Sequence, residues 1–409
     1  MTSRAIQTRT ILVSGASIAG LTLAYWLDRG GLAVTVVEQA PGVRSGGYPI
    51  DVRGTALDVI DRMGLSTQLR RAHVHSRSLE FLDAQGRPIG TLPLQEITAS
   101  QAGRDVELPR GELTAMLYGL TQRSRVRYRF DDAIERLHDD GSAVDVRFRS
   151  GLAGRFDVVI GADGLHSGTR RLAFGPQESF DRDLGFCFNI FSMPNDIGLS
   201  HGGIVQMEAG RSAGAYAVRD SEETCAFLTF ATQSPPFREH RDLQAQRQRT
   251  AAVFAGAGGI VPRLLQAMAC SDDVYFDTVS QIRMPRWSTG RVVLAGDAAH
   301  APSFLSGQGT SLALVGAHVL AGELAERQSV ADAFAAYEMR LRPFVEANQA
   351  LAIREGGPLF LPRNQAELEA RHRLLASLRE GELPGLPVDD ARGVHESLRL
   401  PPYTFGQAP

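Results

Sequence analysis

Three short glycine-bearing loops carry the residues that could do chemistry in this 409-residue chain. The first loop places Gly15, Ser17 and Gly20 at the three positions of the Gly-x-Gly-x-x-Gly fingerprint, with serine in place of the second glycine. Glu38 follows 18 residues after Gly20. Such a unit brings a helix N-terminus to a pyrophosphate and an acid to a ribose hydroxyl. The motif favours a dinucleotide site, and a bare strand–helix–strand turn is the alternative.

The other two loops each combine glycine with an aspartate after a short apolar run. Residues 161–164 include Asp163 and Gly164, and residues 296–309 include Asp297. Each carboxylate can accept hydrogen bonds from backbone amides or from ligand hydroxyls, although a turn-forming role is the plain alternative. Loops at the carboxyl ends of parallel strands lie along one edge of a sheet, where ligands bind. We therefore expect the three loops to share one site.

Apolar β-branched runs predict the strands that must position these loops. Strands are expected at residues 10–14, 33–37 and 156–160 and again from residue 291, with a helix after each glycine loop. Residues 105–120 are expected to form a short strand and a helix, with Arg110 at their junction. Further expectations are a loop at 39–54, a helix at 55–63, a hairpin at 78–92, and an antiparallel pair formed by 125–130 and 143–149.

The composition changes after about residue 176, where short aromatic and β-branched runs alternate with turns. This pattern predicts an antiparallel sheet, followed by helices at 241–257 and 261–268 and a long strand at 274–284. Helices are also expected at 331–349, around Pro343, and at 364–378, and the proline-rich tail has no clear fold signal. The fold class is therefore α/β, with a three-layer dinucleotide-binding domain, a second antiparallel β-sheet domain and C-terminal helices.

Composition excludes several classes of function. The net charge of −3 does not predict binding to nucleic acid or to an anionic membrane. All 43 basic residues are arginine, which excludes chemistry that needs a Schiff-base or P-loop lysine. The three cysteines form no Cys-x-x-Cys motif, and no segment is typical of a signal peptide or a membrane span. We expect a cytoplasmic protein with no membrane partner.

Taken together, GASIAG with Glu38, DVVIGADGLHSGTR, and RVVLAGDAAHAPSFLSGQG resemble the single-component FAD-dependent monooxygenases of the para-hydroxybenzoate hydroxylase type. Within that class, the chain looks most like tetracycline-inactivating and polyketide-tailoring hydroxylases. The resemblance covers residues 9–64, 105–120, 156–171 and 282–345, and it is only architectural between 177 and 281.

The resemblance implies a cofactor site for FAD, assigned position by position. The pyrophosphate would be bound by Gly15, Ser17 and Gly20, the adenosine ribose by Glu38, and the ribitol by Asp297. The remaining cofactor positions are Ala16, Asp51, Arg53, Arg110, Asp163, Gly164, Gly307, Gln308 and Gly309. A helix that begins at the last three would stabilise the anionic reduced flavin.

The resemblance also implies a domain division. The FAD-binding domain would comprise residues 1–72, 104–176 and 282–330, and the substrate-binding sheet residues 73–103 and 177–281, with C-terminal helices and a tail at 331–409. The candidate substrate-lining residues are Asn189, Phe191, Tyr216, Phe227, Pro302 and Phe304, and core packing is the alternative for those on the sheet. Relatives often have adjacent prolines in the third loop, where this chain has Ser303 and Phe304 after Pro302.

The implied reaction consumes NADPH or NADH and O2 and hydroxylates an aromatic or enolic, polyketide- or antibiotic-like small molecule through a hydroperoxyflavin. Two kinds of alternative remain. One is a non-catalytic protein that binds flavin or an antibiotic, and the other is a Baeyer–Villiger or epoxidising flavoenzyme on the same scaffold. The substrate, the position oxidised and the oligomeric state do not follow from the sequence.

Overall fold

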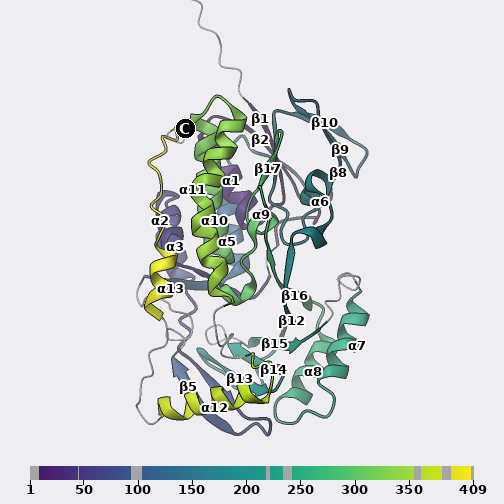
Figure 1. Ribbon diagram of the computed structural model, residues 1–409, viewed down its shortest axis with the longest axis vertical. Coiled ribbons are helices and arrows are strands. Elements are labelled where there is room, and N and C mark those ends of the chain that lie inside the picture. The colour runs from purple at the N-terminus through teal and green to yellow at the C-terminus, as the bar shows by residue number, and fades with distance from the viewer. Residues whose placement is uncertain are drawn as a thin grey trace, which may run out of the picture.

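The computed structural model describes residues 9–44, 46–93, 104–217, 222–233, 242–353, 361–379 and 388–406, which form two sheet-based domains. Figure 1 shows one domain above the other, with the long strands β12 (Asp181–Pro194) and β16 (Tyr275–Ile282) reaching from the lower domain towards the upper one. No helix in the described ranges is both long enough and apolar enough to cross a membrane.

A six-stranded sheet forms the centre of the upper domain, in the order β17-β18-β11-β1-β2-β7. Its strands are β1 (Thr10–Ser14), β2 (Ala33–Val37), β7 (Arg127–Arg129), β11 (Val158–Gly161), β17 (Ser288–Thr289) and β18 (Val292–Leu294), and all neighbours are parallel except β17 and β18. Every residue of β11 and β18 is buried, as is typical of parallel strands covered on both faces.

The register brings the three glycine loops to the same edge of this sheet. Ser14, at the end of β1, pairs with Val37 on one side and Gly161 on the other, and Gly161 pairs with Leu294. The loops that follow β1, β11 and β18 therefore leave the sheet side by side. The expected convergence of the three loops is confirmed.

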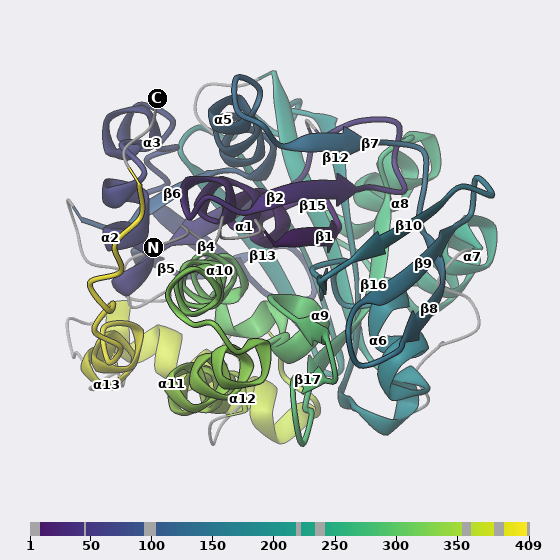
Figure 2. The same cartoon turned by 90° about the horizontal axis from the view of Figure 1, so that it is seen from above.

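Helices cover one face of this sheet and a small antiparallel sheet covers the other (Figure 2). The helices are α1 (Ile18–Arg29), α2 (Thr55–Arg62), α3 (Ser66–Arg71), α5 (Arg110–Thr121), α10 (Gly309–Glu326) and α11 (Val330–Leu351). The small sheet consists of β8 (Ile134–Asp139), β9 (Val144–Phe148) and β10 (Ala153–Phe156), and two short helices, α6 (Gly168–Phe174) and α9 (Asp297–His300), follow the second and third loops. This is the expected three-layer arrangement.

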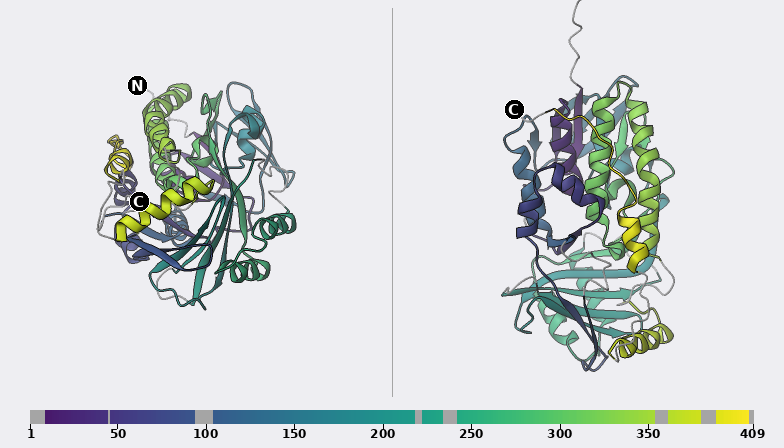
Figure 3. Two further views of the ribbon diagram at one scale, coloured as in Figure 1. Left: turned by 60° about the horizontal axis from the view of Figure 1, so that its bottom comes forward. Right: turned by 90° about the vertical axis from the view of Figure 1, so that its left-hand side faces the viewer.

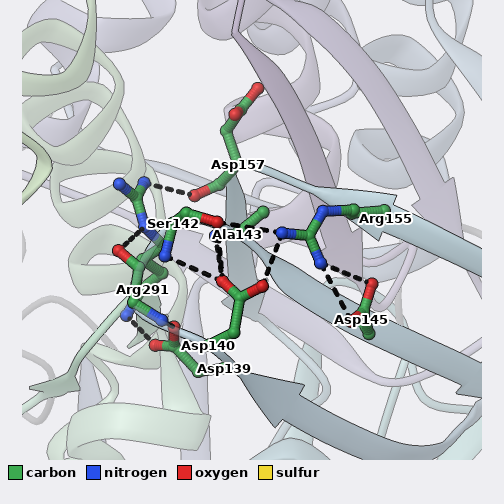
Figure 4. A network of polar contacts seen from close by, with 9 residues as sticks. Asp139, Asp140, Ser142, Ala143, Asp145, Arg155, Asp157 and Arg291 are labelled. Atoms are coloured by element: carbon green, nitrogen blue, oxygen red, sulfur yellow. Dashed lines mark hydrogen bonds and ion pairs between the residues drawn. The ribbon is translucent and has the colours of Figure 1, made fainter.

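A polar network at the edge of the upper domain joins the small sheet to the central one (Figure 4). Arg155 contacts Asp140 at 2.6 Å and Asp145 at 2.9 Å, which links β10 to the β8–β9 turn and to β9. Arg291, just before β18, donates from its backbone amide to Asp139 and from its guanidinium to the carbonyl of Asp157. These contacts fix the start of the strand that leads into the third glycine loop.

The lower domain is a seven-stranded sheet in the order β16-β12-β15-β14-β13-β4-β5. Its remaining strands are β4 (Ser78–Leu82), β5 (Pro88–Pro93), β13 (Gly202–Glu208), β14 (Arg211–Ala217) and β15 (Glu223–Ala231). All neighbours are antiparallel except β13 and β4, so the predicted antiparallel sheet and the hairpin at 78–92 merge into one sheet.

Helices flank both faces of the lower sheet. The outer face is covered by α7 (Leu243–Val253) and α8 (Val261–Cys270), through a core that includes Phe191, Leu228 and Leu264. On the inner face, α12 (Gln365–Arg379) packs Leu368 and Leu375 against β5 and β13. The rest of the inner face is directed towards the upper domain (Figure 3).

Two expectations about local structure were wrong. The segment 39–54, expected to be a loop, contains β3 (Pro49–Val52), which pairs antiparallel with β6 (Val106–Pro109). Residues 125–130 and 143–149 do not pair with each other, because β7 joins β2 in the central sheet while β9 lies between β8 and β10. The β3–β6 and β2–β7 pairings join segments far apart in the chain, so local pattern alone could not select these partners, whereas β8, β9 and β10 pair as local hairpins.

The C-terminal segment, which had no clear fold signal, is ordered against the upper domain (Figure 3). Helix α13 (Val388–His395) lies beside α11, and the residues after it run along α2, α10 and α1. Thr55 donates to the carbonyl of Leu398, and the hydroxyl of Tyr403 donates to Glu323 at 2.7 Å. Phe405 rests on Trp26, with ring centroids 4.5 Å apart. Isolated aromatic residues hold the tail in place, and they leave no periodic signal in the sequence.

Candidate functional site

The first glycine loop is too tightly folded for side chains at its two glycines. Gly15 has a φ of 106°, and a Cβ there would lie 2.5 Å from the carbonyl oxygen of Ala162 in the second loop. A Cβ at Gly20 would lie 1.9 Å from the carbonyl oxygen of Gly15. Glycine is therefore required at both positions, and the first two loops touch through their backbones.

Ser17, the departure from the fingerprint, lies at the N-cap of α1 and faces Arg110. Its hydroxyl makes no capping bond in the described chain, and its Oγ instead accepts a hydrogen bond from Nη2 of Arg110 at 3.1 Å. Arg110 is the first residue of α5, as expected for the strand–helix junction. Its aliphatic stem lies along Gly47, where a Cβ would be 3.5 Å away. The helix N-terminus and a guanidinium together form a positive surface that suits a phosphate group.

Glu38 lies at the end of β2, directly beside the first loop. Its Oε2 accepts from the backbone amide of Ala16 at 2.8 Å, and its Oε1 accepts from the amide of Ala40 at 2.9 Å. The acid that the fingerprint predicts is thus adjacent to the glycine turn. Its carboxylate also holds that turn in shape.

Asp163 in the second loop is bound by the residues that follow it. Its carboxylate accepts from the hydroxyl of Ser167 at 2.5 Å, and from the amide and hydroxyl of Thr169, both at 2.9 Å. Gly164 has a φ of 82° and open space where a Cβ would lie. Arg170, fully buried, joins this loop to the third one by donating to the carbonyls of Leu165 at 2.6 Å and Ala298 at 2.9 Å.

Asp297 opens the third loop and faces a hollow in the protein. Its surface is exposed, yet desolvation by the surrounding protein raises its pKa above the ordinary value, against the opposing effect of Arg110 and Arg170. We infer that this accessible carboxylate lies on a concave surface between the upper domain and the lower sheet, which we call the hollow. A Cβ at Gly309 would lie 3.8 Å from Oδ1 of Asp297, so the carboxylate also adjoins the start of α10.

Asp51 and Arg53 approach the third loop from β3 and the turn after it. Nη2 of Arg53 lies 2.6 Å from Oδ2 of Asp51, and a Cβ at Gly307 would be 3.6 Å from that oxygen. The backbone amide of Arg53 donates to the hydroxyl of Ser311 in α10 at 3.2 Å. The segment that carries these two predicted cofactor positions is therefore joined to the loop that precedes α10.

Gln308 is the clearest sign that this site is built for a ligand. Its side chain is fully buried, and within the described chain neither its amide nitrogen nor its amide oxygen has a hydrogen-bond partner. An unsatisfied buried amide costs about 1–3 kcal/mol for each lost partner. A flavin pyrimidine ring offers both a donor and acceptors at one edge, so the residues of this loop fit the group that the sequence motifs imply.

A second set of polar side chains lines the same hollow. Tyr275 is 40 % exposed, although desolvation raises its pKa well above the ordinary value. The pKa of Tyr48 is also raised, chiefly by burial, and Tyr48 lies within electrostatic range of Arg110, Asp297 and Asp277. The hollow therefore extends from the glycine loops to the lower sheet.

Four of the six predicted substrate-lining residues lie on elements that face the hollow. Tyr216 and Phe227 project from the inner face of the lower sheet, since their strand neighbours Ala215 and Ala226 belong to the outer core. The pKa of Tyr216 is raised well above its ordinary value by burial, with smaller effects from Cys225 and Glu107.

The third loop supplies the other two of these four. Phe304 stacks on Phe188 of the inner face, with ring centroids 4.8 Å apart. Pro302 is buried just before it, and its carbonyl accepts from Gln281 at 3.0 Å. The third glycine loop and the inner face of the lower sheet are therefore in direct contact.

Asn189 and Phe191 do not reach the hollow, so they do not line a substrate site there. Both are buried on the outer face of β12, where Asn189 donates to the hydroxyl of Thr250 in α7 at 2.8 Å and Phe191 joins the core beneath α8. Side chains alternate along a strand, so Phe188 and Ile190 take the inner positions instead. The sequence suggested the strand correctly but could not tell which of its faces meets the upper domain.

The third loop contains a strained residue at position 303, where the resemblance leads us to expect a proline. Ser303 has a φ of 79° and a ψ of 147°, a region that is almost restricted to glycine. Proline, whose ring fixes φ near −65°, could not take this conformation. Position 303 could therefore not hold a proline in this conformation, and Phe304, which follows it, stacks on Phe188.

Several residues around the hollow were not singled out from the sequence. Glu107 lies opposite Asp51 in the β3–β6 pair, and burial together with that neighbour raises its pKa to about 7. Tyr275 and Asp277 share a face of β16, a spacing of two that alternation along the predicted strand could have identified. No local signal marked Tyr48, whose position depends on the unexpected strand β3.

Comparison with known proteins agrees with this geometry. Residues 8–352 match the family model described as FAD binding domain. The chain is 44 % identical over 363 residues to an uncharacterized protein of Mycobacterium tuberculosis, covering 88 % of this chain and 97 % of the relative. It is 38 % identical over 346 residues to a flavin-dependent monooxygenase from an unknown prokaryotic organism, covering 85 % and 89 % of the two chains.

A solved structure extends the comparison over almost the whole chain. The crystal structure of tetracycline destructase Tet(55) superposes with a TM-score of 0.82 at 34 % sequence identity, and the match covers 97 % of this chain and 99 % of that one. The shared fold includes both the upper and the lower domain.

Proposed function

The chain belongs to the FAD-binding domain family of flavin-dependent monooxygenases. We propose that it hydroxylates an aromatic or enolic small molecule with NAD(P)H as the reductant. The observation that carries the proposal is that the third glycine loop meets the inner face of the lower sheet, where Phe304 stacks on Phe188. Beside this junction lie Asp297, which is exposed, and Tyr275, which is 40 % exposed. This is a site that can hold a cofactor against a second, flat molecule.

The residues of the upper domain would hold FAD in the order that the loops suggest. The N-terminus of α1, with Gly15, Ala16, Ser17 and Gly20, and the neighbouring Arg110 suit the pyrophosphate, and Glu38 suits the adenosine ribose. Asp297 suits the ribitol, and the segment from Gly307 to Gly309 suits the flavin, where Gln308 has an unsatisfied amide. When bound, FAD supplies the reduction of O2 that amino-acid side chains cannot perform.

The chain's own residues would orient the substrate and exclude water. Phe227 and Phe304 offer apolar surface for a planar ring, with the buried Phe188 behind Phe304, and the hydroxyls of Tyr216 and Tyr275 offer hydrogen bonds to ring substituents. A polyketide- or antibiotic-like substrate agrees with this combination of flat apolar area and few polar groups. The likeness to a tetracycline destructase supports the same class.

A substrate panel tests the proposal. The purified FAD-loaded protein is supplied with NADPH or NADH and with single phenolic, enolic or polycyclic compounds, tetracycline included. We expect oxygen-dependent NAD(P)H oxidation above the substrate-free rate, and a product heavier by one oxygen atom in mass spectrometry. A ring-expanded lactone or an epoxide would favour the other oxidative outcomes on this scaffold. A protein that binds the compounds without consuming NAD(P)H would contradict the proposed activity.

The flavin assignment has its own test. Replacing Asp297 with alanine removes the carboxylate that faces the hollow, so the purified variant should be colourless or nearly so. The control is Asp58→Ala on the exposed side of α2, which should remain yellow. Full flavin occupancy in the Asp297 variant would show that the third loop is wrongly placed against the cofactor.

A further inference from the structure

Two acidic side chains project from the β3–β6 pair on the side away from the upper-domain core. Asp51 of β3 lies directly opposite Glu107 of β6 in the antiparallel register. The other face of the same two strands is buried in the upper-domain core and consists of Ile50, Val52, Val106 and Leu108. Because side chains alternate along a strand, both carboxyl groups point away from that core.

The lower sheet and the third loop border these carboxyl groups. Tyr216, on the inner face of the lower sheet, lies within electrostatic range of both Asp51 and Glu107. Asp51 also adjoins the third loop, since a Cβ at Gly307 would lie 3.6 Å from its Oδ2. Glu107 is partly accessible. The Glu107 carboxyl therefore lies in the hollow, between the end of the third loop and the inner face of the lower sheet.

The two acids differ in their partners. Oδ2 of Asp51 lies 2.6 Å from Nη2 of Arg53, whose side chain is only 3 % exposed. Side chains directly opposite each other in an antiparallel pair have Cβ atoms about 4.5–5.5 Å apart, and two like charges at that distance destabilise the pair. The arginine compensates the charge of Asp51, so a single proton shared by the two acids is best placed on Glu107.

The surroundings of Glu107 favour its protonated form at neutral pH. Burial, together with the charge of Asp51, raises the pKa of Glu107 from 4.5 to about 7, and the Ser76 hydroxyl and Arg53 oppose the rise. A protonated carboxyl has one O–H to donate and still accepts at its remaining oxygen, so the Ser76 hydroxyl does not exhaust it. A carboxyl group kept neutral in this way is a hydrogen-bond donor, which a carboxylate is not.

We propose that protonated Glu107 donates a hydrogen bond to a carbonyl oxygen of the substrate, and thereby selects phenolic or enolic rings that carry a keto group. The inference rests on the proposed function and narrows its substrate class. A keto oxygen has lone pairs and no proton, so it matches the O–H of Glu107 and would be repelled by two carboxylates. The proton stays on the carboxyl group, and no covalent bond is formed or broken.

The other groups around Glu107 leave it as the group that titrates towards the ligand. Asp51 and Arg53 act on it as a charge and its counter-charge. Burial keeps Tyr216 neutral, and it raises the pKa of Cys225, the residue opposite Tyr216 on β15, to about 12. Nδ1 of His73 lies 2.9 Å from the backbone carbonyl of Glu107, so that imidazole contacts the main chain of β6.

The test measures binding without turnover. The FAD-loaded protein is titrated with chromone, a flat bicyclic ketone that has no ionisable proton, and with naphthalene, a flat bicyclic ring that has no acceptor. Perturbation of the flavin absorbance reports occupancy at about pH 6 and about pH 8.5. The variants are Glu107→Gln, which keeps a donor at every pH, and Glu107→Ala, which does not. The matched control is Glu135→Gln, at an exposed position on β8.

We expect the wild type to bind chromone at least about tenfold more tightly at pH 6 than at pH 8.5, because Glu107 loses its proton between these values. Glu107→Gln should bind chromone almost equally at both pH values, and Glu107→Ala weakly at both. The affinity for naphthalene should vary by less than about twofold across the variants and pH values, since that ring forms no hydrogen bond to Glu107. The control should behave as the wild type.

An equal affinity of the wild type for chromone at both pH values would overturn the proposal. So would a Glu107→Gln protein that binds chromone as weakly as Glu107→Ala at pH 6, because the ionised acid would then be the binding form. Failure of the loaded wild type to bind chromone would overturn it as well.

Asp51→Asn provides an independent check through the neighbouring charge. Removing the carboxylate opposite Glu107 lowers the pKa of Glu107, so the affinity for chromone should fall at a lower pH than in the wild type. An unchanged pH midpoint would contradict the shared proton. No NAD(P)H is supplied and no oxygenation is measured, so an unsuccessful substrate panel would leave these results unchanged.

Discussion

Arg110 donates a hydrogen bond from Nη2 to the hydroxyl of Ser17 at 3.1 Å. Ser17 occupies the second position of the glycine fingerprint, so the departure from glycine has a partner 93 residues away in the chain. The hydroxyl fixes the guanidinium over the N-terminus of α1, where a diphosphate would be bound. The turn tolerates this serine because it is small, and its hydroxyl in addition positions the guanidinium of Arg110.

Ser17→Ala should weaken FAD binding without destabilising the protein. A hydrogen bond to a charged group contributes about 1.5–3 kcal/mol when both partners are held in place. At this accessible position we expect its loss to weaken the binding free energy of FAD by about 1 kcal/mol, which is roughly fivefold in affinity. The Ser17 hydroxyl makes no capping bond to α1, so the thermal midpoint of the flavin-free protein should stay the same. Fluorescence titration with FAD measures the affinity.

The same substitution at Ser124, which follows α5 at the end opposite Arg110, provides the control, and its FAD affinity should be unchanged. A Ser17→Ala protein that binds FAD as tightly as the wild type would mean that Arg110 keeps its position without the hydroxyl.

Gln308→Leu should stabilise the flavin-free protein and weaken its affinity for FAD. The leucine has similar volume and removes a buried amide that has no partner in the described chain, which should raise the unfolding free energy by about 1–3 kcal/mol. The same change deletes the group that would meet the flavin pyrimidine edge. Thermal unfolding with and without FAD measures both effects, and the two should have opposite signs. Destabilisation of the flavin-free protein would show that Gln308 already has a partner.

Ser303→Gly should make the protein more stable, because glycine takes the observed φ of 79° without strain. The expected gain is about 1 kcal/mol, reduced by the loss of the weak bond from the amide of Leu305 to the Ser303 hydroxyl at 3.3 Å. Ser303→Ala is the matched comparison, since it loses the same bond but keeps the strain. Chemical denaturation should rank glycine above serine and serine above alanine. A glycine variant no more stable than the alanine variant would contradict the strain.

The upper domain could be predicted well from the sequence, because the motifs that indicate it are local in the chain. Each glycine loop directly follows a buried strand, so the motif and the element that positions it are neighbours, and the parallel register follows from the fold. The lower domain was predicted as a sheet, but its orientation was not. Asn189 and Phe191 were chosen from the correct strand and lie on the wrong face, since both faces of β12 are apolar and alternation gives no preference between them.

The residues that sequence reasoning missed depend on contacts between distant segments. Tyr48 and Glu107 reach the hollow only because β3 pairs with β6, and the two strands are separated by more than fifty residues. His166 lies inside a motif that was recognised, yet its partner Asp277 comes from another domain. A single sequence contains no measure of such pairings. The cofactor side of the site is therefore largely predictable, and the substrate side is not.

His300, which belongs to the third motif but faces away from the hollow, should make the fold sensitive to acid. It is buried against Trp287, with ring centroids 4.8 Å apart, and burial lowers its pKa from 6.5 to about 3. Above pH 6.5 the imidazole is neutral in both the folded and the unfolded chain. Between pH 6.5 and about 3 only the unfolded chain binds the proton, so the unfolding free energy falls by up to about 1.4 kcal/mol per pH unit as the pH decreases.

His300→Gln removes this titration while keeping a polar side chain of similar length. Its unfolding free energy should depend less steeply on pH than that of the wild type in this window, by up to about 1.4 kcal/mol per pH unit, whatever its stability at neutral pH. Urea denaturation at a series of pH values measures the slope. His138→Gln, at an exposed position on β8, should leave the slope of the wild type in place. Parallel curves for His300→Gln and the wild type would show that His300 is protonated in the folded protein, which its contact with Trp287 and Tyr337 argues against.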